Sequence, residues 1–185
     1  MTMELIVIAI ATQEKTTPNY VVPRSNFTND DAYLLGVPCK VLSDQPYKKY
    51  RKTCFGDLKL NDVIDVQSCV TGLKYTIPFD WVRGYDSLVQ ANDDAYIIGH
   101  HFPGVKELIG KPYWPRDNSW VNDFDGKWGD LYKKKCEIIS VPFKEKPSDS
   151  NKEHTFILVK YEGKTYRTLF EEWALYEPNP YPHED

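Results

Sequence analysis

The sequence lacks the patterns that most directly assign a function. It has no glycine-rich phosphate loop, no G-x-S-x-G or H-E-x-x-H motif and no C-x-x-C pair. Only four cysteines occur in 185 residues, and none has a histidine at metal-ligand spacing. We therefore expect free thiols in a reducing compartment, and the sequence predicts no metal, no cofactor and no catalytic residue.

Long apolar runs and helical repeats are also missing. No run approaches the length that spans a membrane, so we expect no membrane partner and a cytoplasmic location. The short apolar run at residues 5–11 predicts a buried first strand rather than a signal peptide, because no Lys or Arg precedes it. No helical apolar repeat exceeds about three turns. Thirteen Tyr, five Trp and thirteen Pro favour strands and turns, which predicts a mainly β chain with few short helices.

An excess of positive charge is absent as well. The formal net charge is −4, which argues against a general nucleic-acid coat protein. Residues 1–90 have 10 Lys or Arg and 10 Asp or Glu, so their charges balance. Residues 91–185 have 13 Lys or Arg and 17 Asp or Glu. Neither half is acidic enough to mimic DNA.

What the chain does contain is an internal duplication. Residues 29–36 (NDDAYLLG) recur as residues 92–99 (NDDAYIIG), with six of eight positions identical. We interpret the repeated Asn-Asp-Asp as a turn or helix cap rather than a cation site. Further similarities follow in order, pairing segments 35–38 with 109–112, 55–58 with 128–131, 63–66 with 136–139, and 75–81 with 166–173.

The end of each copy predicts a β-hairpin. Residues 158–166 alternate apolar and polar side chains around Glu162-Gly163, and residues 70–75 form a shorter counterpart. The sequence thus divides into an N-terminal strand or extension (1–28), a first module (29–91), a second module with insertions (92–177) and an extended tail (178–185). The short join between the copies lacks linker composition, which favours close packing of the modules.

Each module reads as a strand, a long loop, a Gly-Asp turn, a strand, a tight hairpin and a final aromatic-rich segment. This order resembles an SH3-like barrel of the KOW or Tudor type, so the chain resembles two tandem small barrels. It is also similar to small early proteins of tailed bacteriophages. That resemblance implies a phage-encoded protein that acts in the host cytoplasm on a host protein. SH3-like barrels serve many functions, so the fold alone does not assign one.

The first candidate binding segment combines four positive charges with two tyrosines. This composition suits an acidic protein surface, or phosphate contacts with base stacking. It also suits a solvated edge strand that carries protective lysines. The candidate residues are Tyr47, Lys48, Lys49, Tyr50, Arg51 and Lys52.

The second candidate segment, residues 112–128, holds three Trp, a Tyr and a Phe in mainly polar chain. Trp, Tyr and Arg dominate the binding energy of protein interfaces, which favours Trp114, Arg116, Trp120 and Phe124 as partner-binding residues. The alternative is that these rings pack the space between the two barrels. Trp128 aligns with an aromatic residue of the first copy, which predicts a structural role for it.

Three functions remain open from the sequence. The leading one is a non-catalytic protein that engages and inhibits a host protein of a defence or transcription system by occluding its surface. The first alternative is a nucleic-acid-binding module of the KOW or Tudor type. The second is a small enzyme or nucleotide binder that uses the inserted His100-His101.

Overall fold

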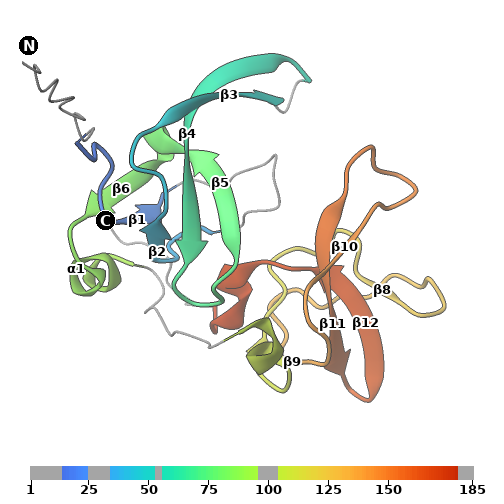
Figure 1. Ribbon diagram of the computed structural model, residues 1–185. Coiled ribbons are helices and arrows are strands. Elements are labelled where there is room, and N and C mark those ends of the chain that lie inside the picture. Colours follow the sequence, from blue (N-terminus) through green and yellow to red (C-terminus); the bar gives the residue numbers. More distant parts are fainter. Residues whose placement is uncertain (1–13, 25–33, 53–55, 96–103, 179–185) are drawn as a thin grey trace, which may run out of the picture.

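The computed structural model describes residues 14–24, 34–52, 56–95 and 104–178. Within them the chain is mainly β, with two antiparallel six-stranded sheets and one short α-helix (Figure 1). The predicted fold class is confirmed at this level. The predicted first strand at residues 5–11 and most of the two NDDAY octamers lie outside the described residues.

The first sheet uses the N-terminal half of the chain. Its order is β3-β4-β2-β1-β6, and β5 pairs with the opposite part of β4. The sheet curves into a half-barrel (Figure 1). Its elements are β1 (Tyr20–Pro23), β2 (Cys39–Val41), β3 (Tyr47–Lys52), β4 (Leu58–Ser68), β5 (Lys74–Pro78), the 3-10 helix η1 (Phe79–Trp81) and β6 (Val82–Tyr85), followed by α1 (Leu88–Asp93).

The second sheet uses the C-terminal half. Its order is β7-β9-β11-β12-β8, and β10 pairs with β11. Its elements are the 3-10 helix η2 (Val105–Leu108), β7 (Pro112–Tyr113), β8 (Asn122–Asp123), β9 (Cys136–Ile138), β10 (Phe143–Glu145), β11 (His154–Tyr161), β12 (Lys164–Leu169) and the 3-10 helix η3 (Glu172–Leu175).

The two sheets follow the same path. In the first, β1, β2, β4 and β5 pair in succession, β3 adds to β4, and η1 follows β5. In the second, β7, β9, β11 and β12 pair in succession, β10 adds to β11, and η3 follows β12. The strands β2 and β9 even share one burial pattern, in which a central exposed residue separates two buried ones. The remaining strands differ, because β6 pairs with β1 and β8 with β12, so the two halves share only part of their strand pairing.

This pairing corrects part of the correspondence taken from the sequence. The L-x-G-x-P turn does recur, because the amides of Val37 and Lys111 donate to the carbonyls of Leu34 and Leu108 at 2.9 Å in both copies. However, the first turn leads into the second strand of its sheet, β2, whereas the second leads into the first strand of its sheet, β7. Similar turns thus occupy different positions, because turn geometry is set locally and strand order is not.

The hairpin predicted at residues 158–166 is confirmed. Tyr161 pairs with Lys164 across the bend, and the strands β11 and β12 run antiparallel from there. Both bend residues adopt positive φ, 47° at Glu162 and 79° at Gly163, as a two-residue turn between right-twisted strands requires. The shorter counterpart is the bend between β4 and β5 at residues 69–73.

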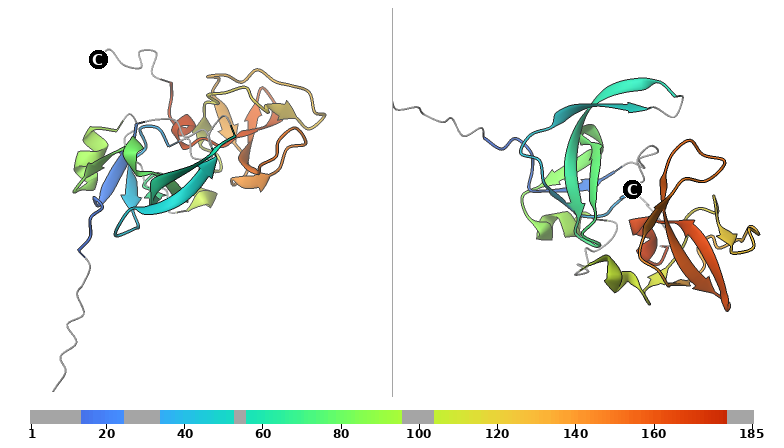
Figure 2. Two further views of the ribbon diagram at one scale, coloured as in Figure 1. Left: turned by 90° about the horizontal axis from the view of Figure 1, so that it is seen from above. Right: turned by 45° about the vertical axis from the view of Figure 1, so that its right-hand side comes forward.

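One apolar core joins the two sheets. Its buried members include Val21, Ile64 and Ile77 from the first half and Ile138 and Ile157 from the second. The 3-10 helix η3 lies between the sheets (Figure 2) and adds Ala174 and Leu175 to the same core. The two halves consequently pack as one body, as the short join between them predicts.

Candidate binding surfaces

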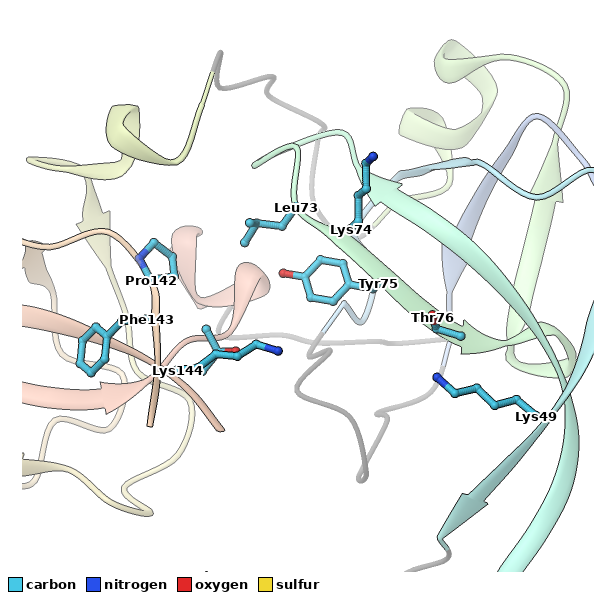
Figure 3. A pocket seen from close by; sticks show the side chains of 9 residues that line it. Lys49, Leu73, Lys74, Tyr75, Thr76, Pro142, Phe143 and Lys144 are labelled. Carbon is cyan, nitrogen blue, oxygen red and sulfur yellow. The ribbon is translucent and has the colours of Figure 1, made fainter. Parts of the chain in front are cut away.

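A cleft between the two sheets is lined mainly by basic and aromatic side chains. It has a volume of about 410 Å³ and lies between β3 and β5 on one side and β10 and β11 on the other. Lys49 and Lys144 reach into it from opposite walls (Figure 3). Among the described residues its lining contains no carboxylate and consists of Lys49, Leu73, Lys74, Tyr75, Thr76, Pro142, Phe143, Lys144 and Thr155.

The carboxylates on the neighbouring strands already have partners. Asp65 accepts hydrogen bonds from the hydroxyls of Tyr47 at 2.8 Å and Thr76 at 2.7 Å. Glu145 forms an ion pair with Arg167 on β12. Arg167 thus compensates the charge of Glu145, and the hydroxyl groups bind Asp65 without neutralising it. The lining itself is basic, so an anionic ligand is the chemical class that it attracts.

The walls of the cleft are held together by one buried carboxyl group. Glu172 of η3 is 2% exposed, and it accepts hydrogen bonds from the hydroxyls of Ser68, Thr71 and Tyr75 in the first half. The Tyr75 hydroxyl lies 2.7 Å from Oε1 of Glu172, which fixes the tyrosine ring in the lining of the cleft. These hydrogen bonds join residues that are distant in the sequence, and they help to position one sheet relative to the other.

Burial dominates the chemistry of this carboxyl group. Desolvation raises the pKa of Glu172 from 4.5 to about 7, although the hydrogen bonds from Ser68, Thr71 and Tyr75 oppose that rise. The adjacent Glu171 is also largely buried, and desolvation followed by repulsion from Asp117 raises its pKa to about 7. The join between the sheets therefore contains two carboxyl groups that titrate near neutral pH.

The first predicted binding segment is a strand rather than a loop. Residues 47–52 form β3, which pairs with the N-terminal half of β4. The side chains of Tyr47, Lys48, Lys49 and Tyr50 are exposed, and Lys48 forms an ion pair with Asp62 at 2.9 Å. Arg51 differs, because it is buried with its guanidinium 5.8 Å from the centre of the Trp81 ring. Lys52 ends the strand.

The second predicted segment, residues 112–128, differs most from its prediction. Trp114, expected as a partner-binding ring, is only 8% exposed, and its amide donates to the carbonyl of Ala174 at 2.7 Å. The guanidinium of Arg116, expected to orient a partner, donates to the carbonyls of Trp173 and Tyr176 and lies 5.1 Å from the Trp173 ring. The Trp114 ring is thus buried, and the Arg116 guanidinium is used within the chain by the carbonyls at η3.

The remaining rings divide between packing and exposure. Trp120 packs on β11, with its ring 4.4 Å from that of His154 and its indole N–H donated to Asp149. Phe124 is 78% exposed. Trp128, expected to be structural, is 65% exposed although its indole N–H donates to the carbonyl of Asn118. Trp114, predicted to be accessible, is therefore buried, whereas Trp128 is largely exposed.

Sequence reasoning missed most of the cleft. Of the predicted residues only Lys49 lines it, whereas Lys74, Tyr75 and Lys144 were not singled out. Lys74 and Tyr75 stood in the predicted hairpin, and Lys144 in a charged segment of the second copy. Their approach depends on how η3 joins the sheets, and no local pattern encodes that arrangement.

Other chemistry finds little support in the described part of the chain. There, no group of three His, Cys, Asp or Glu side chains could hold a metal ion, and no helix is long and apolar enough to cross a membrane. His100-His101 lies outside the described residues. Burial raises the pKa of the Cys69 thiol to about 11 and that of Cys136 to about 12, so neither is a thiolate nucleophile near neutral pH.

Comparisons with models of known protein families, with curated proteins and with solved structures found no match for this chain.

Proposed function

We propose that the chain is a non-catalytic binding protein made of two SH3-like modules, and that the cleft of Lys49, Lys74 and Lys144 is its binding surface. The shared strand order of the two halves supports the modular part of this proposal. In each half a 3-10 helix also follows the second strand of the hairpin.

The observation that carries the proposal is the charge of the cleft. Three lysines line it and, among the described residues, no carboxylate does, although the whole chain has a net charge of −4. A local basic surface in an acidic protein favours a selective acidic partner over general binding to polyanions, because the overall charge repels a long polyanion. The partner class that fits is an acidic segment of a protein.

The mechanism would be occlusion of the partner's surface. The cleft would attract the acidic segment and set its orientation, and the exposed ring of Phe124 would add apolar contact area. The resemblance to small early proteins of tailed bacteriophages supports a host protein as the partner, in a defence or transcription system.

Single-stranded nucleic acid is the competing ligand. Tyr75 and Phe143 lie beside the lysines in the lining, and bases stack on such rings while lysines contact the phosphates. The two ligands differ in a measurable way, since binding to nucleic acid weakens steeply with salt in proportion to the phosphates neutralised.

Direct binding measurements test the proposal. The variant Lys49→Gln/Lys74→Gln/Lys144→Gln empties the cleft of charge, and Lys106→Gln/Lys127→Gln/Lys164→Gln removes the same number of exposed lysines elsewhere. Fluorescence anisotropy would follow a labelled glutamate-rich peptide and a single-stranded oligonucleotide of matched charge. We expect the cleft variant to lose about tenfold in peptide affinity, at roughly 0.5 kcal/mol for each screened contact, and the control variant to bind normally.

Two results would contradict the proposal. Equal losses in both variants would show that net charge, and not the cleft, determines binding. Tighter binding of the oligonucleotide than of the peptide, with a steep salt dependence that the cleft variant abolishes, would assign the cleft to nucleic acid.

A further inference from the structure

The strand β3 forms one edge of the first sheet. In the described part of the chain it pairs with β4 alone, from Tyr47 opposite Val63 to Lys52 opposite Leu58. Its other edge, over residues 47–50, therefore presents the backbone groups that a further strand would bind. Addition of an extended segment to such an edge is a common mode of peptide recognition.

The outer part of this edge belongs to a two-stranded arm. β5 pairs with β4 only from Val63 onward, so residues 58–62 have β3 as their single neighbour in the described sheet. The arm projects from the body of the first sheet (Figure 1). A two-stranded ribbon is marginally stable by itself, whereas a third strand would complete a small sheet.

The two faces of the arm have different chemistry. Residues directly opposite each other in an antiparallel pair share a face, so Tyr50 lies with Leu60, and Lys48 lies on the same face with Asp62, which compensates its charge. On this face Tyr50 is 66% exposed, Leu58 70% and Leu60 45%. The leucines of β4 therefore give this face an exposed apolar area beside the charged strand β3.

The other face of the arm is basic. It carries Lys49 opposite Asn61 and Arg51 opposite Lys59, and Lys49 also lines the cleft between the sheets. A strand added beside β3 would place alternate side chains on these two faces, because side chains in a strand point to opposite sides in turn. The two faces of the arm therefore favour a ligand strand whose side chains alternate in chemistry.

We propose that β3 binds an extended segment of the partner protein in which acidic and apolar residues alternate. The acidic residues would lie beside Lys49, with Lys59 beyond it on β4, and the apolar residues would lie beside Tyr50 and extend towards Leu58 and Leu60 on β4. This inference rests on the proposed function and gives the acidic segment its sequence pattern and its backbone conformation.

A second copy of this chain is a poor occupant of the same edge. Four of the six residues of β3 are Lys or Arg, so two β3 strands side by side would oppose like charges. Charge complementarity selects an acidic strand instead.

Peptides with the same composition but a different order of residues test the inference. A labelled peptide of alternating Glu and Val is compared with a block peptide in which all Glu precede all Val. Two further versions of the alternating peptide carry backbone N-methyl groups on its odd or its even residues. An added strand uses the amides of only one alternate set, so one methylated version should lose binding and the other should keep it within about twofold.

Two variants test whether the peptide binds to the arm. We expect Leu58→Gln/Leu60→Gln to weaken the alternating peptide about fivefold and to leave the block peptide unchanged, since only an ordered strand meets that face. Val89→Gln, which replaces an equally exposed residue on α1, is the matched control. Both substitutions are on the surface, and circular dichroism checks that the fold is retained.

The outcomes separate the two proposals. If both methylated versions lose affinity equally, or the block peptide binds as tightly as the alternating one, strand addition is wrong, while the loss in the lysine variant still supports the cleft. If the methylated versions differ but the lysine variant binds normally, strand addition stands and the cleft is wrong. If no peptide binds, both are wrong.

Discussion

Glu172 shows how much one residue contributes to this molecule. Its carboxyl group is the acceptor for three hydroxyl groups of the other half, and the surrounding core excludes water from it. Removing it would leave several buried donors unsatisfied, at a cost of about 1–3 kcal/mol for each. The same burial makes the join between the sheets sensitive to pH.

We expect the free energy of unfolding to fall as pH rises from about 4.5 to about 7. The folded pKa values of Glu172 and Glu171 are about 7, above the usual 4.5, so the folded state binds more protons than the unfolded state in this interval. Their stabilising contribution is complete below pH 4.5 and is lost as pH rises through about 7. Urea unfolding at a series of pH values measures this loss of stability.

Glu172→Gln provides the control for this pH effect. The amide keeps the shape of the side chain but does not titrate, so the pH dependence should shrink to the part that Glu171 contributes. A variant with an unchanged slope between pH 4.5 and 7 would show that Glu172 does not titrate there.

At the scale of single elements, the hairpin of β11 and β12 depends on its bend. Gly163 has a φ of 79°, a conformation that strains any residue with a Cβ atom, although no atom lies within 4 Å of the Cβ position. The cost of a substitution there is consequently conformational rather than steric. This element was predictable from sequence because alternation and a Glu-Gly bend are both local signals.

Gly163→Ala should therefore lower the free energy of unfolding by about 1 kcal/mol. Gly104→Ala is the matched control, since Gly104 has extended backbone at a φ of 174° and also has open space around its Cβ position. Thermal unfolding followed by circular dichroism compares the two. Equal stability of the two variants would rule out the strained bend as the source of the effect.

The arm of β3 and β4 was harder to predict. The sequence identified residues 47–52 as a basic and aromatic binding segment but placed them in a loop. The same side chains on a strand gain a fixed alternation, so Lys49 turns to the cleft while Tyr50 turns to solvent with Leu60. Partners across a sheet come from another part of the chain, and the composition of one segment cannot identify them.

On the scale of the whole molecule, the shared core determines behaviour. Buried residues of both sheets and of η3 form one cluster, and the Glu172 hydrogen bonds cross the same join. A duplicated chain could have formed two independently stable units. Here neither half can lose its packing without exposing apolar surface of the other.

We therefore expect a single cooperative unfolding transition. Four of the five tryptophans lie in the second half, so their fluorescence reports mainly on that half, whereas circular dichroism reports on both. The two signals should change together, and Ile157→Ala should lower both midpoints with a loss of about 2–5 kcal/mol. Val89→Ala, at an exposed position, should leave both within about 0.5 kcal/mol. Two separated transitions would show independent modules.

The sequence alone determined the β class, the duplication, the hairpin at Glu162-Gly163 and the close packing of the halves. Each follows from a signal carried by neighbouring residues: alternation, turn residues, a repeated octamer or a short join. Only the tertiary structure decided which aromatic rings are buried, which strands correspond and where the lysines meet. Trp114 and Trp128 are one residue type in one segment, yet their exposure differs because η3 covers the first and not the second. Lys49 and Lys74 of the first sheet line one cleft with Lys144 of the second sheet, and the Glu172 contact that joins the sheets spans about half of the chain.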